Sequence, residues 1–172
     1  GSIMLRKKSK RHFYIVTVIM VLLVIWTAWS NTTVGITHYT VASDRLPASF
    51  DHYSIVVVSD LHNAEFGENN SQLIKLIEKE KPDIIVITGD LVDSNKTNID
   101  IAQKLVGTLT GIAPCYYVTG NHEAWLGEQY QELESILLDE GVAILHDRAL
   151  QLIKNTESIQ LAGLDDPDFT DR

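Results

Sequence analysis

Three short apolar runs in the sequence each end in side chains that can bind a metal ion. Asp60 and His62 follow the first run, Asp90 follows the second, and Asn121 and His122 follow the third. Carboxylate, imidazole and amide groups together form a mixed N/O donor set, which suits Mn, Fe or Zn better than Ca or Mg. Two such ions about 3.5–4 Å apart can clamp a phosphoryl group and activate a water between them. The residue types therefore point to metal-assisted chemistry on a phosphoester.

The spacing suggests a different task for each side chain. Asp60 and His62 are separated by one residue, so both can reach the same ion. The carboxylate of Asp90 has two oxygens and can bridge two cations. Asn121 offers a neutral amide oxygen, and the neighbouring His122 would point elsewhere, free to act on a substrate.

Each signal is weak when taken alone. A single Asp after a strand is usually a turn or helix-cap residue, and Gly-Asp and Gly-Asn pairs are common in turns. A single His is more often a surface residue or a satisfied core residue. The three polar clusters, however, recur at intervals of 30 and 31 residues, about one strand–helix–strand unit each. This regular recurrence favours one shared site.

The elements that position these residues can be read from hydrophobic patterning. The three apolar runs are Ser54–Ser59, Asp83–Thr88 and Cys115–Thr119. Continuous apolar runs without alternation are typical of strands covered on both faces, as in a parallel sheet. Ligand sites in such sheets lie just beyond the carboxyl ends of the strands. The pattern thus predicts an α/β fold whose loops gather the candidate ligands at one edge.

Helical spacing separates the predicted strands. Ser71 can cap a helix with apolar residues three and four apart, and Ile99–Leu109 and Gln129–Asp139 show similar spacing, with Gly141 as a stop for the last. Three shorter strands are predicted afterwards, at Val142–Leu145, Ala149–Ile153 and Ser158–Ala162. Alternation of strands and helices predicts βαβ units and a parallel α/β sheet.

The motifs Asp60-Leu-His62, Gly89-Asp90 and Gly120-Asn-His-Glu123 resemble the first three motifs of the calcineurin-like metallophosphoesterases, over about residues 54–166. The resemblance implies a four-layer α/β/β/α sandwich and a dinuclear metal centre with a bridging hydroxide. It implies that Asp60 and His62 bind the first metal, that Asp90 bridges both metals and that Asn121 binds the second. It also implies that His122 stabilises the transition state or protonates the leaving oxygen.

The sequence departs from the family pattern in its second half. The family uses a further His after a later strand and a Gly-His-x-His motif, and neither occurs before Arg172. We therefore expect a truncated domain that hydrolyses phosphomonoesters or phosphodiesters weakly or not at all. The alternative is a non-catalytic, membrane-tethered module that binds a metal or a partner. His146 is not expected to be a ligand, and Asp165 and Asp166 are expected to serve turn and surface roles.

The N-terminal segment has the features of a membrane anchor. Phe13–Trp29 contains no charged residue, and a helix over residues 13–30 would span roughly 27 Å, close to a hydrocarbon core. Five basic residues precede it, which places the N-terminus in the cytoplasm and the rest of the chain outside. A cleaved signal peptide is the main alternative. The segment Leu161–Pro167 also resembles the membrane-associated bacterial branch of the family.

These features divide the chain into four parts. They are a cloning remnant and basic tail at residues 1–12, an anchor at 13–30, a connector at 31–51 with an edge strand near Gly35–Val41, and a phosphoesterase domain at 52–172. A membrane location makes a lipid-linked or cell-envelope phosphoester an attractive substrate.

Composition excludes several other functions. Beyond residue 30 the chain holds 9 basic and 23 acidic residues, a net charge of −14, so nucleic-acid binding is not expected. No Gly-x-Gly-x-x-Gly or Walker-type loop occurs, which argues against nucleotide binding. The single cysteine, Cys115, lies in an apolar run and is predicted to be a buried structural thiol.

Overall fold

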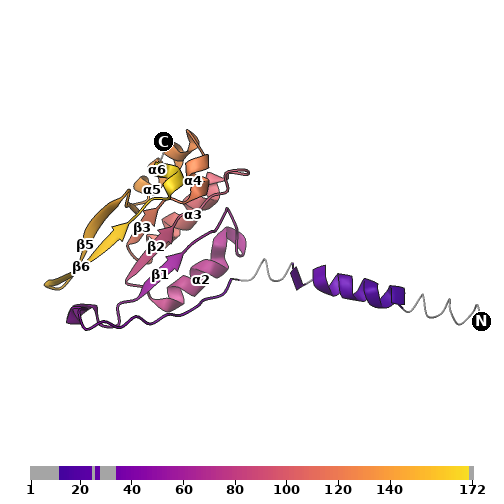
Figure 1. The fold of residues 1–172 in the computed structure, drawn as a ribbon, viewed down its shortest axis with the longest axis horizontal. Coiled ribbons are helices and arrows are strands. Elements are labelled where there is room, and N and C mark those ends of the chain that lie inside the picture. Colours follow the sequence, from indigo (N-terminus) through magenta and orange to yellow (C-terminus); the bar gives the residue numbers. More distant parts are fainter. Residues whose placement is uncertain (1–11, 25, 28–33, 171–172) are drawn as a thin grey trace, which may run out of the picture. The chain divides into compact units, whose positions relative to one another are not determined.

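The computed structural model describes residues 12–24, 26–27 and 34–170 (Figure 1). The chain divides into two compact units, residues 1–35 and 36–172. In the first unit, residues 12–24 and 26–27 are helical and their side chains are exposed. Within the described parts of the chain, no helix is both long enough and apolar enough to cross a membrane. The predicted anchor at 13–30 includes residues 25 and 28–30, which lie outside the described residues.

The second unit is built on a parallel sheet of four strands in sequence order. The strands are β1 (Ile55–Val58), β2 (Ile84–Thr88), β3 (Cys115–Val118) and β4 (Ala143–Ile144). Val57 pairs with Val86 and Ile87 pairs with Tyr117, all in parallel register. The predicted parallel sheet is therefore confirmed, and its strands all end at the same edge (Figure 1).

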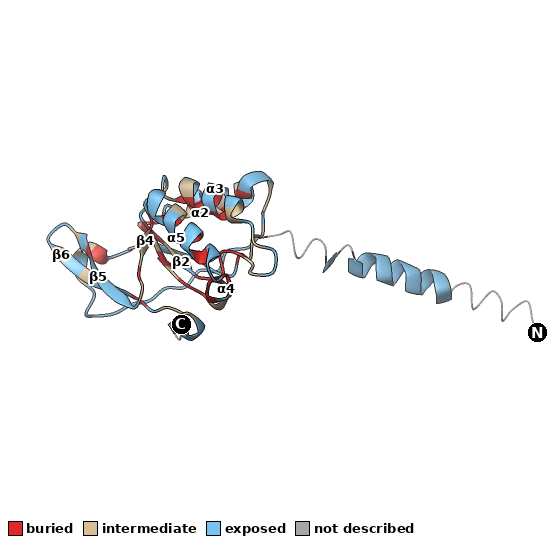
Figure 2. Ribbon diagram, turned by 90° about the horizontal axis from the view of Figure 1, so that it is seen from above, coloured by how far each residue is buried: buried red, intermediate tan, exposed pale blue. Residues whose placement is uncertain are grey.

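One face of this sheet is covered by helices α2 (Ser71–Glu80), α3 (Ile99–Leu109) and α5 (Gln129–Asp139) (Figure 2). The bounds of α3 and α5 agree with the sequence prediction, because their apolar residues follow a clear helical period. Gly141 has a φ of 85° just after α5, as its predicted role as a helix stop requires. The predicted cap at Ser71 is wrong by one residue, since Ser71 is the first helical residue and Asn70 occupies the capping position.

The other face carries an antiparallel hairpin of β5 (Arg148–Lys154) and β6 (Glu157–Gly163). Leu152 of the hairpin packs with Ile84 of β2 and with Phe50 in a buried cluster. Side chains alternate along a strand, so Ile85 and Tyr117, both fully buried, belong to the helix-covered face instead. The described residues therefore supply a helical layer, a parallel sheet and a hairpin, in agreement with a mixed α/β fold.

Cys115 begins β3 on the helix-covered face and is buried, as predicted. Burial raises the pKa of its thiol to about 11, so the thiol is protonated at neutral pH. This is a packed structural thiol and not a reactive one.

The predicted edge strand at Gly35–Val41 is wrong. Residues 34–43 have no regular secondary structure, and Tyr39 and Val41 are almost fully exposed. Because these side chains remain in solvent, the segment would gain little from pairing with the sheet. Further along, a short 3-10 helix (Ala48–Phe50) inserts Phe50 between the hairpin and the sheet.

Candidate metal centre

The candidate ligands lie at the carboxyl ends of the first three strands. Asp60 follows β1 by two residues, and Asp90 follows β2 by two residues. Asn121 and His122 open a short helix, α4 (Asn121–Trp125), that the sequence analysis did not predict. The sheet edge therefore gathers loops that are about 30 residues apart in the chain, as expected for a parallel sheet.

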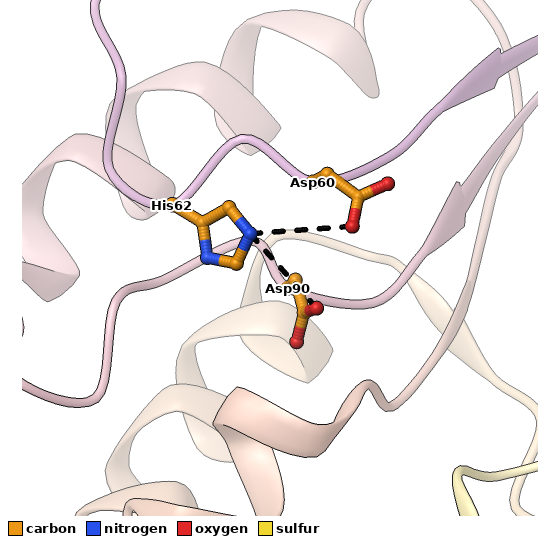
Figure 3. Close-up of side chains that lie close together, drawn as sticks. All are labelled: Asp60, His62 and Asp90. Atoms are coloured by element: carbon orange, nitrogen blue, oxygen red, sulfur yellow. Dashed lines mark ion pairs between the residues drawn. The ribbon is translucent and has the colours of Figure 1, made fainter.

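Asp60, His62 and Asp90 come together at this edge (Figure 3). Each offers one ligand atom, and these three atoms all lie within 4.8 Å of one another. The Nε2 atom of His62 is 4.0 Å from Oδ1 of Asp60 and 4.0 Å from Oδ2 of Asp90. Metal–ligand bonds of roughly 2.0–2.2 Å place two ligands of one ion up to about 4.4 Å apart. The three side chains therefore fit a shared divalent cation, with little adjustment.

The backbone at these three residues adopts an uncommon conformation. The φ angles of Asp60, His62 and Asp90 are 55°, 46° and 50°, in the left-handed region that residues with a Cβ rarely occupy. Such strain gathers at functional sites, where the surrounding structure holds it in place. Here the His62 N–H donates to the carbonyl of Asp90 at 2.9 Å, which joins the two ligand loops directly.

Two glycines allow the loops after β2 and β3 to touch. A Cβ on Gly89 would overlap the backbone nitrogen of Gly120, and a Cβ on Gly120 would overlap the Asp90 side chain. Gly89 also has a φ of 83°. The Gly-Asp and Gly-Asn pairs are thus required by the close approach of two backbones.

Glu123 fastens these two loops and was not recognised as important from the sequence. Its side chain is fully buried. Oε2 accepts hydrogen bonds from the N–H groups of Asp90 and Gly120, both at 2.8 Å, and Oε1 accepts one from Leu91 at 2.8 Å. A signal was present, because Glu123 is the third residue of α4, where Glu commonly caps the N-terminus of its own helix.

His122 lies beside the three clustered side chains. Its backbone N–H donates to Oδ1 of Asp90 at 2.9 Å, and its ring centroid is 4.4 Å from that of His62. Its Nδ1 accepts a hydrogen bond from the N–H of Ser94 at 3.1 Å. A neutral ring with Nδ1 as acceptor carries its proton on Nε2, from which it can donate a hydrogen bond to a substrate oxygen.

Asn121 precedes His122 in the first turn of α4 and is half-buried. The structure therefore brings Asp60, His62, Asp90 and His122 together and places the backbone of Asn121 next to them.

His146 and Asp165 lie in a separate cluster, and the predicted surface role of Asp165 is wrong. The Asp165 side chain is only 3% exposed, and its Oδ2 is 2.7 Å from Nδ1 of His146. The Nε2 atom of His146 is 2.9 Å from Oε1 of Glu134. Both ring nitrogens of His146 are therefore engaged by carboxylates outside the group formed by Asp60, His62 and Asp90.

Comparison with known proteins shows which family the chain resembles. Residues 53–166 match the family model described as calcineurin-like phosphoesterase. An uncharacterized metallophosphoesterase of Aquifex aeolicus is 33% identical over 76% of this chain and 48% of its own length. A bovine transmembrane protein with a metallophosphoesterase domain is 29% identical over 94% of this chain and 38% of its own length.

Among solved structures, phosphopantetheinyl hydrolase (PptH) from Mycobacterium tuberculosis matches 63% of this chain and 41% of its own, with 18% identity and a TM-score of 0.46. The chain spans about half the length or less of the curated relatives it matches. Those relatives come from bacteria and animals, so they do not place the chain in a bacterial branch. The matched family model covers most of the second unit and all of the clustered side chains, and the chain belongs to the calcineurin-like phosphoesterase family.

Proposed function

We propose that this chain carries the metal site of a metal-dependent phosphoester hydrolase. The observation that carries the proposal is the cluster of Asp60, His62 and Asp90, whose ligand atoms lie within 4.8 Å of one another at the carboxyl edge of the sheet. Asp60 and His62 would hold a first divalent ion, Asp90 would contact both ions of a pair, and Asn121 would bind the second. Such ions polarise a phosphoryl oxygen and activate water for attack on phosphorus.

The protein's own residues would then position the substrate and donate hydrogen bonds to it. His122 is held by Ser94 on one side and by the Asp90 carboxylate at its backbone on the other. With Nδ1 accepting from Ser94, the neutral ring keeps its proton on Nε2, which would donate a hydrogen bond to an oxygen of the substrate and stabilise the negative charge that develops there. The proposal makes no choice between phosphomonoesters and phosphodiesters.

The test combines metal binding with turnover. Calorimetric titration with Mn²⁺ should show binding by the chain and none by Asp60→Asn at the same concentrations, since that change removes a charged ligand. Hydrolysis of bis(p-nitrophenyl) phosphate should depend on Mn²⁺ and fall in His122→Ala. If the chain binds no Mn²⁺, the proposal fails. Tight Mn²⁺ binding without turnover would instead favour the metal-binding module as the function of this chain.

We also propose that the N-terminal segment tethers the domain to a membrane, with a lipid-linked or envelope phosphoester as substrate. The support is the uncharged stretch Phe13–Trp29 after five basic residues, and the bovine relative named as a transmembrane protein, which aligns with 94% of this chain. Expression of the chain followed by carbonate extraction should leave it in the membrane pellet. Recovery in the carbonate supernatant would overturn the tether.

A further inference from the structure

A second buried carboxylate holds the loop that carries Asn121 and His122. The Asp165 side chain lies in the segment between β6 and the short helix α6 (Pro167–Thr170) and is 3% exposed. Its Oδ1 accepts two hydrogen bonds from Thr119, one from the backbone N–H at 3.2 Å and one from the hydroxyl at 2.7 Å. Its Oδ2 contacts Nδ1 of His146 at 2.7 Å. Each oxygen of this carboxylate therefore has a separate partner.

Thr119 lies at the start of the loop that carries Asn121 and His122. It follows β3 directly, is buried, and is separated from Asn121 only by Gly120. The next N–H along the chain, that of Gly120, donates to Glu123. Two successive backbone N–H groups before Asn121 are therefore fixed by two different buried carboxylates. The loop therefore has little freedom to change the direction in which its backbone runs into Asn121 and His122.

Asp165 is itself held in place by contacts with other residues. His146 bridges Asp165 and Glu134, and its ring stacks on Phe169 of α6 with centroids 5.6 Å apart and an interplanar angle of 6°. The Asp165 N–H also donates to Oδ1 of Asp147 at 3.1 Å. Because both the side chain and the backbone N–H of Asp165 are hydrogen-bonded, its carboxylate is held in place and can fix the backbone of Thr119.

We propose that Asp165 is a positioning residue for the Asn121–His122 end of the metal centre. The inference rests on the proposed function, and it assigns Asp165 an indirect role through the backbone of Thr119. Groups that orient ligands from outside the coordination shell commonly matter for metal affinity because they fix the ligand before the ion arrives. The competing explanation is that Asp165 only attaches the α6 segment to the domain. The two explanations differ in whether the effect of Asp165 depends on Asn121.

The experiment is a double-mutant cycle on Mn²⁺ affinity, measured by calorimetry on the whole chain. Asp165→Ala should weaken Mn²⁺ binding about tenfold, and Asn121→Ala should weaken it by at least as much. In the Asn121→Ala background, Asp165→Ala should add less than about twofold, because its effect passes through Asn121. A role in attaching α6 alone would leave affinity unchanged, or lower it equally in both backgrounds.

The matched control is Asp168→Asn, three residues away and exposed, which should leave Mn²⁺ affinity unchanged. Circular dichroism and thermal unfolding check that each variant is folded. If Asp165→Ala does not fold, Thr119→Val replaces it in the cycle, since it removes the 2.7 Å hydroxyl hydrogen bond while keeping the backbone N–H. We expect Thr119→Val to weaken binding roughly threefold, again only when Asn121 is present.

The outcomes separate the two proposals. If the unaltered chain binds no Mn²⁺, the proposed function fails, and this inference fails with it. If the chain binds Mn²⁺ through Asp60 and Asp90 but Asp165→Ala or Asn121→Ala binds equally well, only the positioning role is overturned.

Discussion

The molecule contains two clusters of one histidine with two carboxylates, and they are built in opposite ways. In the open cluster, Asp60, His62 and Asp90, a single ring nitrogen lies 4.0 Å from both carboxylates. In the closed cluster, Glu134, His146 and Asp165, each ring nitrogen has its own carboxylate, at 2.9 and 2.7 Å. The open cluster leaves room for a cation among three donors, whereas in the closed cluster both ring nitrogens of His146 are already engaged by carboxylate oxygens.

Backbone conformation separates the clusters equally well. All three members of the open cluster have positive φ angles, while Glu134, His146 and Asp165 do not. Local strain is tolerated where other interactions enforce it, and here Glu123 and the contact between Gly89 and Gly120 enforce it. Residue types alone would therefore not identify a metal site, because both clusters consist of one histidine and two carboxylates. Distances, ring nitrogens and backbone strain together distinguish them.

The largest effect should come from removing the carboxylate that holds the open cluster together. Glu123→Ala leaves three buried N–H groups without their acceptor, so we expect the free energy of unfolding to fall by at least about 3 kcal/mol. In Glu123→Gln the free energy of unfolding should fall less, because one acceptor oxygen remains. Urea denaturation measures both, with the exposed Glu132→Ala as control. A loss below about 1 kcal/mol in Glu123→Ala would show that Glu123 does not hold these loops.

Removing the shared ligand should affect metal binding more than stability. Asp90→Asn keeps an oxygen for the His122 N–H but loses the negative charge, so we expect Mn²⁺ affinity to fall more than about 100-fold. Thermal unfolding gives a second measurement. At 100 times its dissociation constant, Mn²⁺ should stabilise the unaltered chain by about 2.7 kcal/mol and leave Asp90→Asn unchanged. Equal Mn²⁺ stabilisation of both proteins would remove Asp90 from the site.

The contribution of the closed cluster to the free energy of unfolding should depend on pH. Burial alone would lower the pKa of His146, but hydrogen bonds to Glu134 and Asp165 outweigh it and raise the pKa. Tyr130 also faces the ring, and burial raises its pKa too, so it stays neutral. A raised folded-state pKa stabilises the protein below the unfolded pKa of about 6.5, and that stabilisation is lost as pH rises through the folded value.

His146→Gln should therefore cost more stability at pH 6 than at pH 8. The expected loss is about 1 kcal/mol at pH 6, since the ring is partly exposed and its hydrogen bonds are to charged groups. Urea denaturation at the two pH values measures the difference. A loss that is the same at both values would mean that protonation of His146 contributes nothing to the fold.

Sequence patterns predicted the open cluster well because its signals are local. Each member lies within a few residues of the end of an apolar run, and parallel strands must end at one edge, so Asp60, His62 and Asp90 could be placed together without coordinates. The bounds of α3 and α5 were predicted for a similar reason, since helical periodicity is contained within one segment.

The sequence could not reveal the roles of Glu123 and Asp165 because these depend on burial by distant segments. Asp165 reads as a turn residue next to Asp166, yet it is buried by Thr119 and His146, which lie 46 and 19 residues away. The prediction of a strand at Gly35–Val41 was wrong for a different reason. The composition of the segment allowed a strand, but among the described residues the segment forms no strand pairing.

The smallest effect should come from the outer carboxylate of the closed cluster. Glu134 is about one-third exposed and contacts only one nitrogen of His146, so Glu134→Gln should lower the free energy of unfolding by about 0.5 kcal/mol. Its Mn²⁺ affinity should equal that of the unaltered chain, because Asp165 can still hold Thr119 without it. Measured beside Asp90→Asn, this variant applies a charge-neutralising substitution to a carboxylate of the other cluster. A fall in Mn²⁺ affinity comparable to that of Asp90→Asn would mean that the two clusters act as one site, because Glu134 is not among the side chains whose ligand atoms lie together at the sheet edge.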